Sequence, residues 1–424
     1  MRRGARLRAA CSRGIGHGGA FRGRNALRRP SPPSRPTKAF VLFATPTMST
    51  AAIVFWFSGS LIVYTYAAYP LLVAALSRLR PPVASPLPSD AELPRATIVM
   101  AAYNEAARLP EKIRNLRALD YPAEKLDILV VSDGSTDGSA DVIAGLAGVR
   151  VLAYAQRQGK AHALNLALQH VDTEFVVFCD VRQDLAASSV RRLMADFSVP
   201  GVGAVSGELV HRASGTQTGQ SIGLYWRYEK WIRKSESRLR STVGATGALY
   251  AIRTRDYHPL ASDTILDDFE IPMHIVRRGQ RTLLEPEAYV YDSLQTQSAA
   301  EKKRKIRTLT GNFQTFSRNP WLFSPWQNPV FLQFLSHKVF RLIVPYALAL
   351  ALISSALAPS WFYRAALALQ LGFYLLAAAG QWLPATRNNK LISFAHVFFD
   401  MNVAAIVALL HFVSGRVSAK WEKT

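Results

Sequence analysis

The run of residues from Ala51 to Leu76 contains no charged side chain, and no other feature of this 424-residue sequence restricts the fold as strongly. About 20 predominantly apolar residues in an α-helix cross the core of a bilayer, so this run is long enough to span it. We therefore predict a transmembrane helix over residues 50–77. Arg78 and Arg80 follow at once, and the preference of basic residues for the cytoplasmic side places that end of the helix in the cytosol.

Three further apolar runs lie in the last quarter of the chain, near residues 342–357, 365–383 and 391–413. The mean hydropathy of the whole chain is positive, at +0.07, although it contains many basic residues. Each run is close to the length that crosses a bilayer. We therefore predict about three more membrane spans within residues 342–414.

Residues 1–47 differ in composition from the rest of the chain. They contain ten Arg, one Lys and no Asp or Glu, so they carry half of the formal net charge of +22 and leave +11 for the remainder. Their richness in Arg, Ser, Gly and Pro resembles a transit peptide or mistakenly translated upstream sequence, and Met48 would then be the start. A genuine basic arm is the alternative. The other end of the chain, over 415–424, is also predicted to be a tail.

The basic residues do not predict a nucleic-acid partner. They follow the membrane boundaries and the N-terminal tail instead of gathering on one face of a domain. The two cysteines, Cys11 and Cys179, are too few and too far apart for a disulfide framework or a zinc site. This cysteine content fits a reducing compartment.

A Pro-rich linker at 78–94 leads into a region, 95–297, that alternates short β-branched runs with helical patterns. Such alternation is typical of βαβ units around a buried parallel sheet. We therefore predict an α/β domain with a mostly parallel sheet over this region. The predicted strands include 96–101, 128–131 and 175–179, and the predicted helices include 106–119, 139–146 and 160–169.

Acidic side chains follow the predicted strands at the points where the strands end. In open α/β sheets, ligands bind in the crevice outside the carboxyl ends of the strands. In the first such segment, Ser132–Asp137, Gly134 and small polar residues allow a sharp turn. This turn would leave the Asp133 carboxylate free to accept hydrogen bonds from a nucleobase or ribose. A turn with a helix N-cap is the alternative.

The second acidic segment is Cys179–Asp184, at the end of the predicted strand over 175–179. The carboxylate of Asp180 can hold Mg²⁺ or Mn²⁺ against a diphosphate, because these cations suit oxygen ligands. Such a metal would offset the charge on a leaving nucleoside diphosphate. The alternative is a structural ion pair, since Arg182 follows closely.

The third acidic segment is Ile265–Glu270, in which Asp267 and Asp268 are adjacent. Two like charges close together raise the pKa of one carboxyl group, which can then accept a proton from a sugar hydroxyl. The alternative is that these are acids favoured at a helix N-terminus by the helix dipole.

Together with Ala101–Glu105 after the first strand, these motifs resemble the inverting family 2 glycosyltransferases, which have a GT-A fold. The resemblance covers about residues 95–310 and includes the membrane-embedded synthases of poly-N-acetylglucosamine, cellulose and hyaluronan. It implies a metal-dependent enzyme with a nucleotide-sugar donor. The residues that it assigns to the donor nucleotide are Ala102, Asn104, Glu105, Asp133 and, in a Gly-Lys segment, Lys160.

The same resemblance assigns roles to the remaining acids. Asp180 corresponds to the metal-binding Asp-x-Asp motif and would also contact the donor. The pair Asp267 and Asp268 corresponds to the Glu-Asp motif, with Asp268 as the catalytic base. The segment Gly244–Tyr250 is similar to the acceptor-side loop of the family.

The sequence departs from the family pattern at two places. Arg182 stands where the second metal-binding carboxylate is expected, which leaves Asp180 as the metal ligand. The processive synthases carry Gln-x-x-Arg-Trp, whereas the matching stretch here is Arg304–Thr308 and the tryptophan is missing. Arg307 would still contact the diphosphate. A basic cluster at the membrane surface is a second interpretation of this stretch, and both can hold.

The resemblance implies inverting transfer from a donor, with UDP as the expected nucleotide, onto a growing polysaccharide or glycan. One alternative is single-sugar transfer to a polyprenyl phosphate or another lipid, and another is a non-catalytic glycan-binding assembly subunit. We expect the chain in the inner (plasma) membrane, with its catalytic domain in the cytosol and basic and aromatic interfacial helices over 298–341 against the lipids. Other polysaccharide-export subunits are candidate partners.

Overall fold

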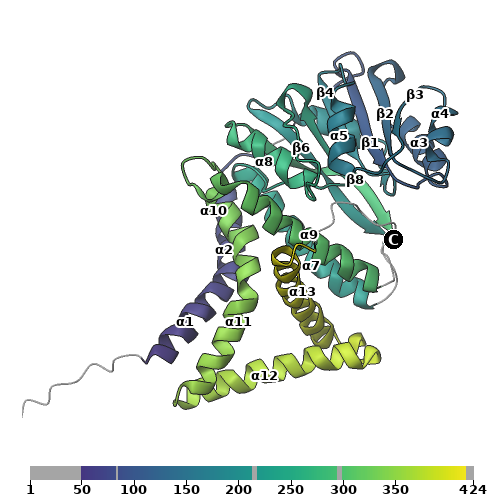
Figure 1. The fold of residues 1–424 in the computed structure, drawn as a ribbon. Helices are drawn as coiled ribbons and strands as arrows, with labels where there is room; N and C mark the ends of the chain where they lie inside the picture. Colours follow the sequence, from purple (N-terminus) through teal and green to yellow (C-terminus); the bar gives the residue numbers. More distant parts are fainter. Residues whose placement is uncertain (1–48, 83–84, 213–216, 294–297, 417–424) are drawn as a thin grey trace, which may run out of the picture. The chain divides into compact units, whose positions relative to one another are not determined.

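The computed structural model describes residues 49–82, 85–212, 217–293 and 298–416, and the structural statements below concern these residues. The predicted basic tail over 1–47 lies outside them. The described chain combines an α/β domain with long apolar helices (Figure 1). This combination is the one that the sequence predicts.

The α/β domain is built on one sheet of eight described strands. They are β1 (Ala96–Ala102), β2 (Leu126–Asp133), β3 (Val149–Tyr154), β4 (Phe175–Cys179), β5 (Asp184–Leu185), β6 (Val202–Arg212), β7 (Leu249–Arg253) and β8 (Arg281–Ser293). Their order is β3-β2-β1-β4-β7-β6-β8-β5. The first four are parallel to one another, as are β6 and β8, whereas β7 is antiparallel to both of its neighbours and β5 is antiparallel to β8. The prediction of a mostly parallel α/β sheet is confirmed.

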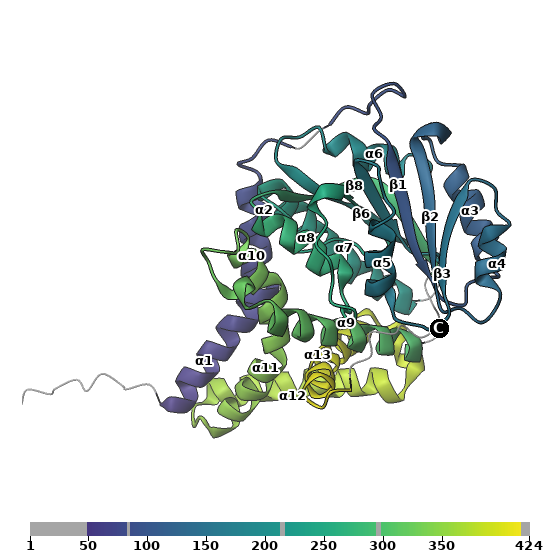
Figure 2. The same cartoon turned by 45° about the horizontal axis from the view of Figure 1, so that its top comes forward.

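Helices cover both faces of the sheet (Figure 2). On one face lie α3 (Leu109–Arg117), α4 (Ser139–Ala144) and α6 (Ser189–Asp196), and on the other lie α5 (Lys160–Leu168) and α8 (Asp267–Arg277). Successive side chains of a strand point to opposite faces, so Ile98 and Met100 of β1 pack with the first set and Val99 packs with the second. All three are fully buried, which explains why the strands are apolar almost throughout.

The parallel strands bring their carboxyl ends to one edge of the sheet. β1 lies between β2 and β4, so the loops that follow these three strands are neighbours. Glu105 follows β1, Asp133 is the last residue of β2, and Asp180 follows β4. The predicted site residues therefore gather at the kind of edge where α/β sheets bind ligands.

Four helices in the described part of the chain are long and apolar enough to cross a membrane. The first, Thr50–Ser77, consists of α1 (Thr50–Val63), the π-helical turn η1 (Tyr64–Ala68) and α2 (Tyr69–Ser77). The second, Phe331–Leu357, consists of α10 (Phe331–Phe334), the π-helical turn η5 (Leu335–Val339) and α11 (Phe340–Leu357). The others are α12 (Trp361–Trp382) and α13 (Lys390–Val413).

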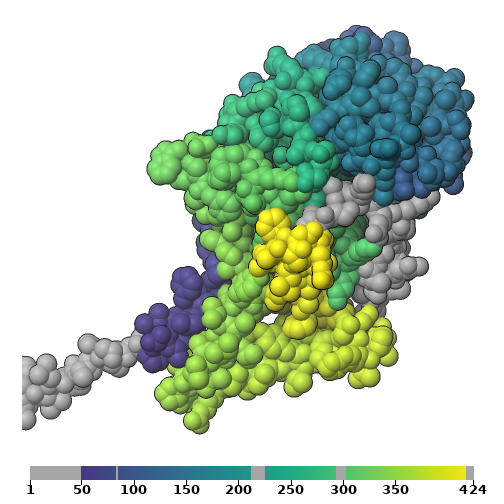
Figure 3. Space-filling view, viewed as in Figure 1, coloured from purple at the N-terminus to yellow at the C-terminus, as the bar shows by residue number. Residues whose placement is uncertain are grey.

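These apolar helices expose large apolar side chains, among them Phe57, Leu369 and Trp382. A soluble domain rarely exposes so much apolar surface, whereas lipid would cover it in a membrane. α13, in yellow, packs beside the green helix α11 (Figure 3). We conclude that the chain is an integral membrane protein.

Two further long helices, α7 (Gln217–Leu239) and α9 (Ser298–Arg318), connect the sheet to the apolar helices. α7 packs on α2 and α13, and α9 packs on α13. One buried apolar cluster contains Phe269 of α8, Phe316 of α9 and Leu342 of α11. The remaining short turns are η2 (Ala123–Lys125), η3 (Thr254–Asp256), η4 (Pro320–Phe323) and η6 (Pro384–Asn388).

Candidate active site

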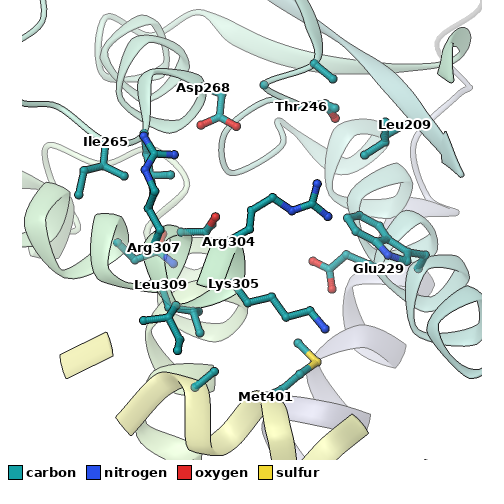
Figure 4. Close-up of a pocket in the computed structure, with 18 of the residues that line it drawn as sticks. Leu209, Glu229, Thr246, Ile265, Asp268, Arg304, Lys305, Arg307, Leu309 and Met401 are labelled. Carbon is teal, nitrogen blue, oxygen red and sulfur yellow. The ribbon is translucent and has the colours of Figure 1, made fainter. Parts of the chain in front are cut away.

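A cavity of about 1610 Å³ begins at the carboxyl edge of the sheet and continues between the apolar helices. Its lining includes Asp180 and Asp268 from the α/β domain, Tyr66 from η1, and Met401 from α13. Figure 4 shows Asp268 on one side of this space and Met401 on the opposite side. Lys and Arg outnumber Asp and Glu two to one among the described residues that line it. A cavity with this charge balance favours anionic ligands.

The loop after β1 is tied to the turn after β2 by hydrogen bonds. Asn104 has a left-handed backbone, with φ of 54°, and its Oδ1 accepts from the backbone N of Thr136 at 2.8 Å. The backbone N of Asn104 donates to Ser135 Oγ at 3.1 Å, and that of Glu105 donates to Ser139 Oγ at 2.9 Å. The two segments predicted to bind the nucleotide thus form one unit at the edge of the sheet.

Asp133 is fully buried, and its carboxylate already has partners. Its Oδ1 accepts from Tyr154 Oη at 2.8 Å and from the backbone N atoms of Gln158 at 2.7 Å and Gly159 at 3.0 Å. The expectation of a free carboxylate is therefore wrong. Asp133 instead holds the loop that leads into Lys160.

Lys160, the first residue of α5, bridges two of the predicted acids. Its Nζ lies 3.1 Å from Asp180 Oδ1 and 3.2 Å from Asp267 Oδ1. Burial alone would lower the pKa of Lys160, but Asp180, Asp267 and Asp268 raise it above the usual range of a lysine. The lysine therefore stays charged and holds the ends of β4 and α8 together.

Asp180 is the predicted residue that fits a divalent cation. Its side chain is 40% exposed, so one carboxylate oxygen can reach a ligand while the other faces Lys160. No group of three His, Cys, Asp or Glu able to hold a metal occurs in the described parts of the chain. Magnesium commonly uses one or two carboxylates and completes its shell with phosphate oxygens and water, so a single carboxylate is compatible with it.

Arg182 does not face a metal position but pairs with Asp292 at the end of β8. Arg182 Nη2 lies 2.5 Å from Asp292 Oδ2, and Gln183 Nε2 donates to the same oxygen at 3.3 Å. The structural ion pair considered for this segment is thus made by Arg182, while Asp180 pairs with Lys160. Sequence reasoning missed Asp292, although it follows the apolar run 288–291 near the end of β8, much as Asp180 follows β4.

The two adjacent acids of α8 have different surroundings. Asp267 accepts from Tyr250 Oη at 3.2 Å and pairs with Lys160, whereas the carboxylate of Asp268 accepts no hydrogen bond from the described residues. Asp268 lines the cavity, and Gly247 leaves room for it, because a Cβ on Gly247 would lie only 2.7 Å from Asp268 Oδ2. The loop that contains Gly247 therefore lies against Asp268.

Burial raises the pKa of the Asp268 carboxyl group to about 6, and the neighbouring Asp267 charge adds to the rise. Lys160 and Lys338 act in the opposite direction. A carboxylate with a pKa near neutrality is a better proton acceptor than an ordinary one, because it combines basic strength with a large ionised fraction near pH 7.

α9 contributes a row of basic side chains to the cavity. Figure 4 shows Arg304 and Lys305 extending into the space and Arg307 lying beside Ile265. Burial lowers the pKa of Arg307, and Asp267, Asp268 and Asp180 oppose that effect, so the guanidinium lies within electrostatic reach of all three acids. The basic stretch predicted from the sequence is thus part of the cavity.

Most of the predicted site residues line the cavity, and three do not. Ala102 is buried in the sheet, while Asn104 and Asp133 hold the loops behind the lining. Those that line the cavity are Glu105, Lys160, Asp180, Asp267, Asp268 and Arg307.

A polar cluster between α7 and the second apolar helix was not predicted. His337 is buried between two carboxylates, with Nε2 2.5 Å from Glu229 Oε1 and Nδ1 2.8 Å from Glu236 Oε1. Arg341 Nη1 lies 2.6 Å from Glu229 Oε2. Burial would raise the pKa of Glu229, but Arg341 and His337 hold it well below its usual range. This cluster fixes the wall of the cavity on which Lys338 stands.

Three comparisons with known proteins bear on the class of this protein. Residues 97–257 match the profile described as Glycosyl transferase family 2. Poly-beta-1,6-N-acetyl-D-glucosamine synthase of Staphylococcus aureus (strain COL) is 24% identical over 239 residues, which cover 54% of this chain and 57% of that protein. The synthase of Staphylococcus epidermidis is 21% identical over 234 residues, covering 53% and 56%. The match spans little more than half the length of these curated relatives.

A solved structure shares the fold over most of the chain. It is mannosyltransferase PcManGT from Pyrobaculum calidifontis, in complex with GDP-Man and Mn2+. The TM-score is 0.64 at 24% sequence identity, and the superposition covers 86% of this chain and 99% of that one. The superposition shows a GT-A-like fold, and the profile match and the curated relatives give the class, a glycosyltransferase. Residues 97–257 form a glycosyl transferase family 2 domain, and the chain is a distant homologue of the poly-N-acetylglucosamine synthases.

Proposed function

We propose that this protein is an inverting, metal-dependent glycosyltransferase that moves a sugar from a nucleotide-sugar donor onto a growing polysaccharide or glycan at the membrane. The observation that carries the proposal is Asp268, a half-buried carboxylate whose pKa is raised to about 6 and which lines the cavity with Lys160 and Asp180. A proton acceptor thus lies next to charges suited to a diphosphate.

Asp268 acts as the general base in this proposal. It takes the proton from an acceptor hydroxyl, and the oxygen attacks the anomeric carbon of the donor sugar from the face opposite the nucleotide. The bond between that carbon and the diphosphate oxygen breaks, and the nucleoside diphosphate leaves with the bonding electrons. A single displacement of this kind inverts the configuration at the anomeric carbon.

The donor end of the cavity, formed by Lys160, Asp180 and Asp267, would bind the nucleotide-sugar diphosphate. Asp180 would hold Mg²⁺ or Mn²⁺ there, which would offset negative charge on the leaving group. Lys160 and Arg307 would add positive charge from the protein itself. The Pyrobaculum relative contains Mn2+ together with GDP-Man, which supports a metal in this role.

The remaining assignments follow from the relatives and from the resemblance. Ala102, Asn104, Glu105 and Asp133 would shape the nucleotide pocket. The loop after β1, which contains Glu105, is joined to the segment after β2 by the hydrogen bond from the Glu105 backbone N to Ser139. UDP is the expected nucleotide, and the GDP-Man of the Pyrobaculum structure makes GDP the second choice. We place the enzyme in the inner membrane with the catalytic domain in the cytosol.

The experiment that tests this function uses the full chain in lipid nanodiscs with a panel of UDP- and GDP-sugars and Mg²⁺ or Mn²⁺. We expect nucleoside diphosphate release with one donor, an inverted anomeric linkage in the product, and loss of release in Asp268→Asn. Product length separates polymer extension from single addition. If no donor on the panel is turned over by the wild-type chain while the chain is folded, the proposed function is wrong.

A further inference from the structure

Among the cations that line the cavity, two near Asp268 form no ion pair within 4.0 Å with an acid of the described residues. They are Arg233 of α7 and Lys338 of η5. Arg233 donates to the hydroxyls of Thr246 at 2.8 Å and Ser206 at 3.0 Å. Within the described residues, no carboxylate oxygen lies within 4.0 Å of either side chain.

Both cations lie close to the proposed base. Arg233 holds Thr246, and the next residue, Gly247, is the one whose Cβ would meet the Asp268 carboxylate. Lys338 Nζ lies 5.7 Å from the ring centre of Phe269, which follows Asp268 in α8. The cations therefore reach the space that an acceptor must enter to place a hydroxyl on Asp268.

A charged side chain without a close acidic partner is energetically unfavourable where Lys338 lies. Lys338 belongs to a helix long and apolar enough to span a membrane, and its side chain is only partly exposed. A charged group in such a place is rare without a partner and is a candidate functional residue for that reason. The neighbouring Arg341 and His337 both form close ion pairs with Glu229, whereas Lys338 interacts with Glu229 and Asp268 only from beyond 4.0 Å.

The cavity continues from these cations into an apolar space between the membrane helices. Its lining there includes Ile62 of α1, Leu342 of α11, and Phe394, Phe398 and Met401 of α13. An alkyl chain gains roughly 0.8 kcal/mol for each CH₂ group that it buries against such a surface.

We propose that Arg233 and Lys338 form a phosphate-binding subsite for an amphipathic acceptor, whose apolar tail lies between α1, α11 and α13. This inference rests on the proposed function, because it names the class of acceptor that presents its hydroxyl to Asp268: a phosphate-bearing lipid-linked saccharide. The phosphate balances the two cations, and the tail occupies the apolar end of the cavity.

The test measures binding and does not depend on turnover. The full chain in phosphatidylcholine nanodiscs, with the donor end filled by UDP and Mg²⁺, is titrated with hexyl phosphate, inorganic phosphate or 1-hexanol in a calorimeter. We expect hexyl phosphate to bind more tightly than either of the others, because it alone offers both the charge and the tail. Lys338→Gln should weaken that binding by about tenfold or more, since a hydrogen bond to a charged group is lost.

Three variants control the result. Lys338→Arg keeps the charge and should keep the binding, and Arg233→Gln should weaken it even if Lys338→Gln fails to fold. Lys234→Gln removes a charge from an exposed neighbour of Arg233 that does not line the cavity, and it should bind as the wild type does. Unchanged binding in both Lys338→Gln and Arg233→Gln, or equal binding of inorganic and hexyl phosphate, overturns the inference.

The same titration separates this inference from the proposed function. UDP binding is measured first, without hexyl phosphate. If UDP binds and a nucleotide sugar is turned over but hexyl phosphate binding is independent of Lys338, only the proposal of a phosphate subsite is wrong. If hexyl phosphate binds through Lys338 but no nucleotide binds or reacts, only the proposed glycosyltransferase mechanism is wrong.

Discussion

The two ends of the cavity differ in how closely their positively charged side chains are paired with acids. At the donor end, Lys160 is paired with Asp180 and Asp267, and Arg182 is paired with Asp292. At the acceptor end, defined by Arg233 and Lys338, the cations have no acidic partner among the described residues. The donor end therefore holds its cations in close ion pairs, while the acceptor end does not.

This difference indicates how each end would respond to a ligand. A diphosphate at the donor end must compete with Asp180 and Asp267 for Lys160. If Lys160 turns to the diphosphate, these two carboxylates need another cation, and a divalent metal would supply one. A phosphate at the acceptor end would meet cations that have no such competitor. Asp268 lies between the two ends and interacts electrostatically with both, since Lys160 and Lys338 each lower the pKa of its carboxyl group.

The largest expected effect is at Asp268, where the two ends meet. Asp268→Asn keeps the size of the side chain and removes the proton acceptor, and a positioned base contributes about 10²–10⁴-fold to rate. Turnover should fall by that range while UDP still binds at the donor end. Steady-state kinetics together with UDP titration of the same preparation measure both quantities.

Asp267→Asn is the matched control, because Asp267 is the neighbouring acid but already pairs with Lys160 and Tyr250. It should weaken donor binding more than it slows the chemical step. An inactive Asp267→Asn beside a normal Asp268→Asn would mean that the two roles are exchanged. Normal turnover in both would place the base elsewhere in the cavity and would remove the mechanism proposed here.

The second effect concerns the metal at the donor end. Chelation of Mg²⁺ and Mn²⁺, or Asp180→Asn, should lower turnover by about 10²-fold, because charge stabilisation by a metal contributes several kcal/mol. Hexyl phosphate binding at the acceptor end should not change. Asp141→Asn, on the exposed side of α4, is the control. Full turnover in excess chelator would shift the leaving-group role to Lys160, Arg182 and Arg307.

A smaller effect should follow from the turn that shapes the donor end. Gly134 has φ of +63°, and a Cβ there would lie 2.4 Å from the backbone N of Arg157. Gly134→Ala should therefore displace the loop that donates to Asp133 and precedes Lys160. We expect the clash with the Arg157 backbone to raise the donor KM by about tenfold. The left-handed conformation, which costs a non-glycine residue about 1–2 kcal/mol, should lower the melting temperature.

Gly138→Ala separates backbone strain from this clash. Gly138 has a similar φ of +80°, but a Cβ there meets nothing within 4 Å. It should lower the melting temperature with little change in donor KM. Equal KM values for the two variants would show that the loop at Arg157 does not shape the donor end.

The sequence predicts the donor end better than the acceptor end, and the reason is physical. Runs such as Phe175–Cys179 are apolar because both faces of the sheet are covered, so the point where the run stops marks the strand end and hence Asp180. The start of α3 was less predictable. A helix was expected from residue 106, but it begins at Leu109, after a segment in which the backbone N–H groups of Glu105 and Ala106 donate to Ser139 and Asp137.

The acceptor end depends on contacts between distant segments. The second membrane helix begins at Phe331, ahead of the apolar run near 342, because His337 and Arg341 are balanced by Glu229 of α7 and so can be buried. No periodicity in the sequence reports such a pairing. The same holds for Arg182 and Asp292, which are 110 residues apart.

The smallest effect is a shift in pH dependence, and it compares the two ends directly. Only ionised Asp268 can accept a proton, so kcat/KM should fall as the pH drops below about 6, the pKa of this group. Asp267 raises that pKa, so Asp267→Asn should move the acidic limb of the profile to lower pH. Lys338 lowers it, so Lys338→Gln should move the limb to higher pH, each by about one unit or less. A pH–rate profile of the three proteins measures these shifts. Movement in the same direction for both variants would contradict the view that Asp268 lies between a carboxylate of the donor end and a cation of the acceptor end.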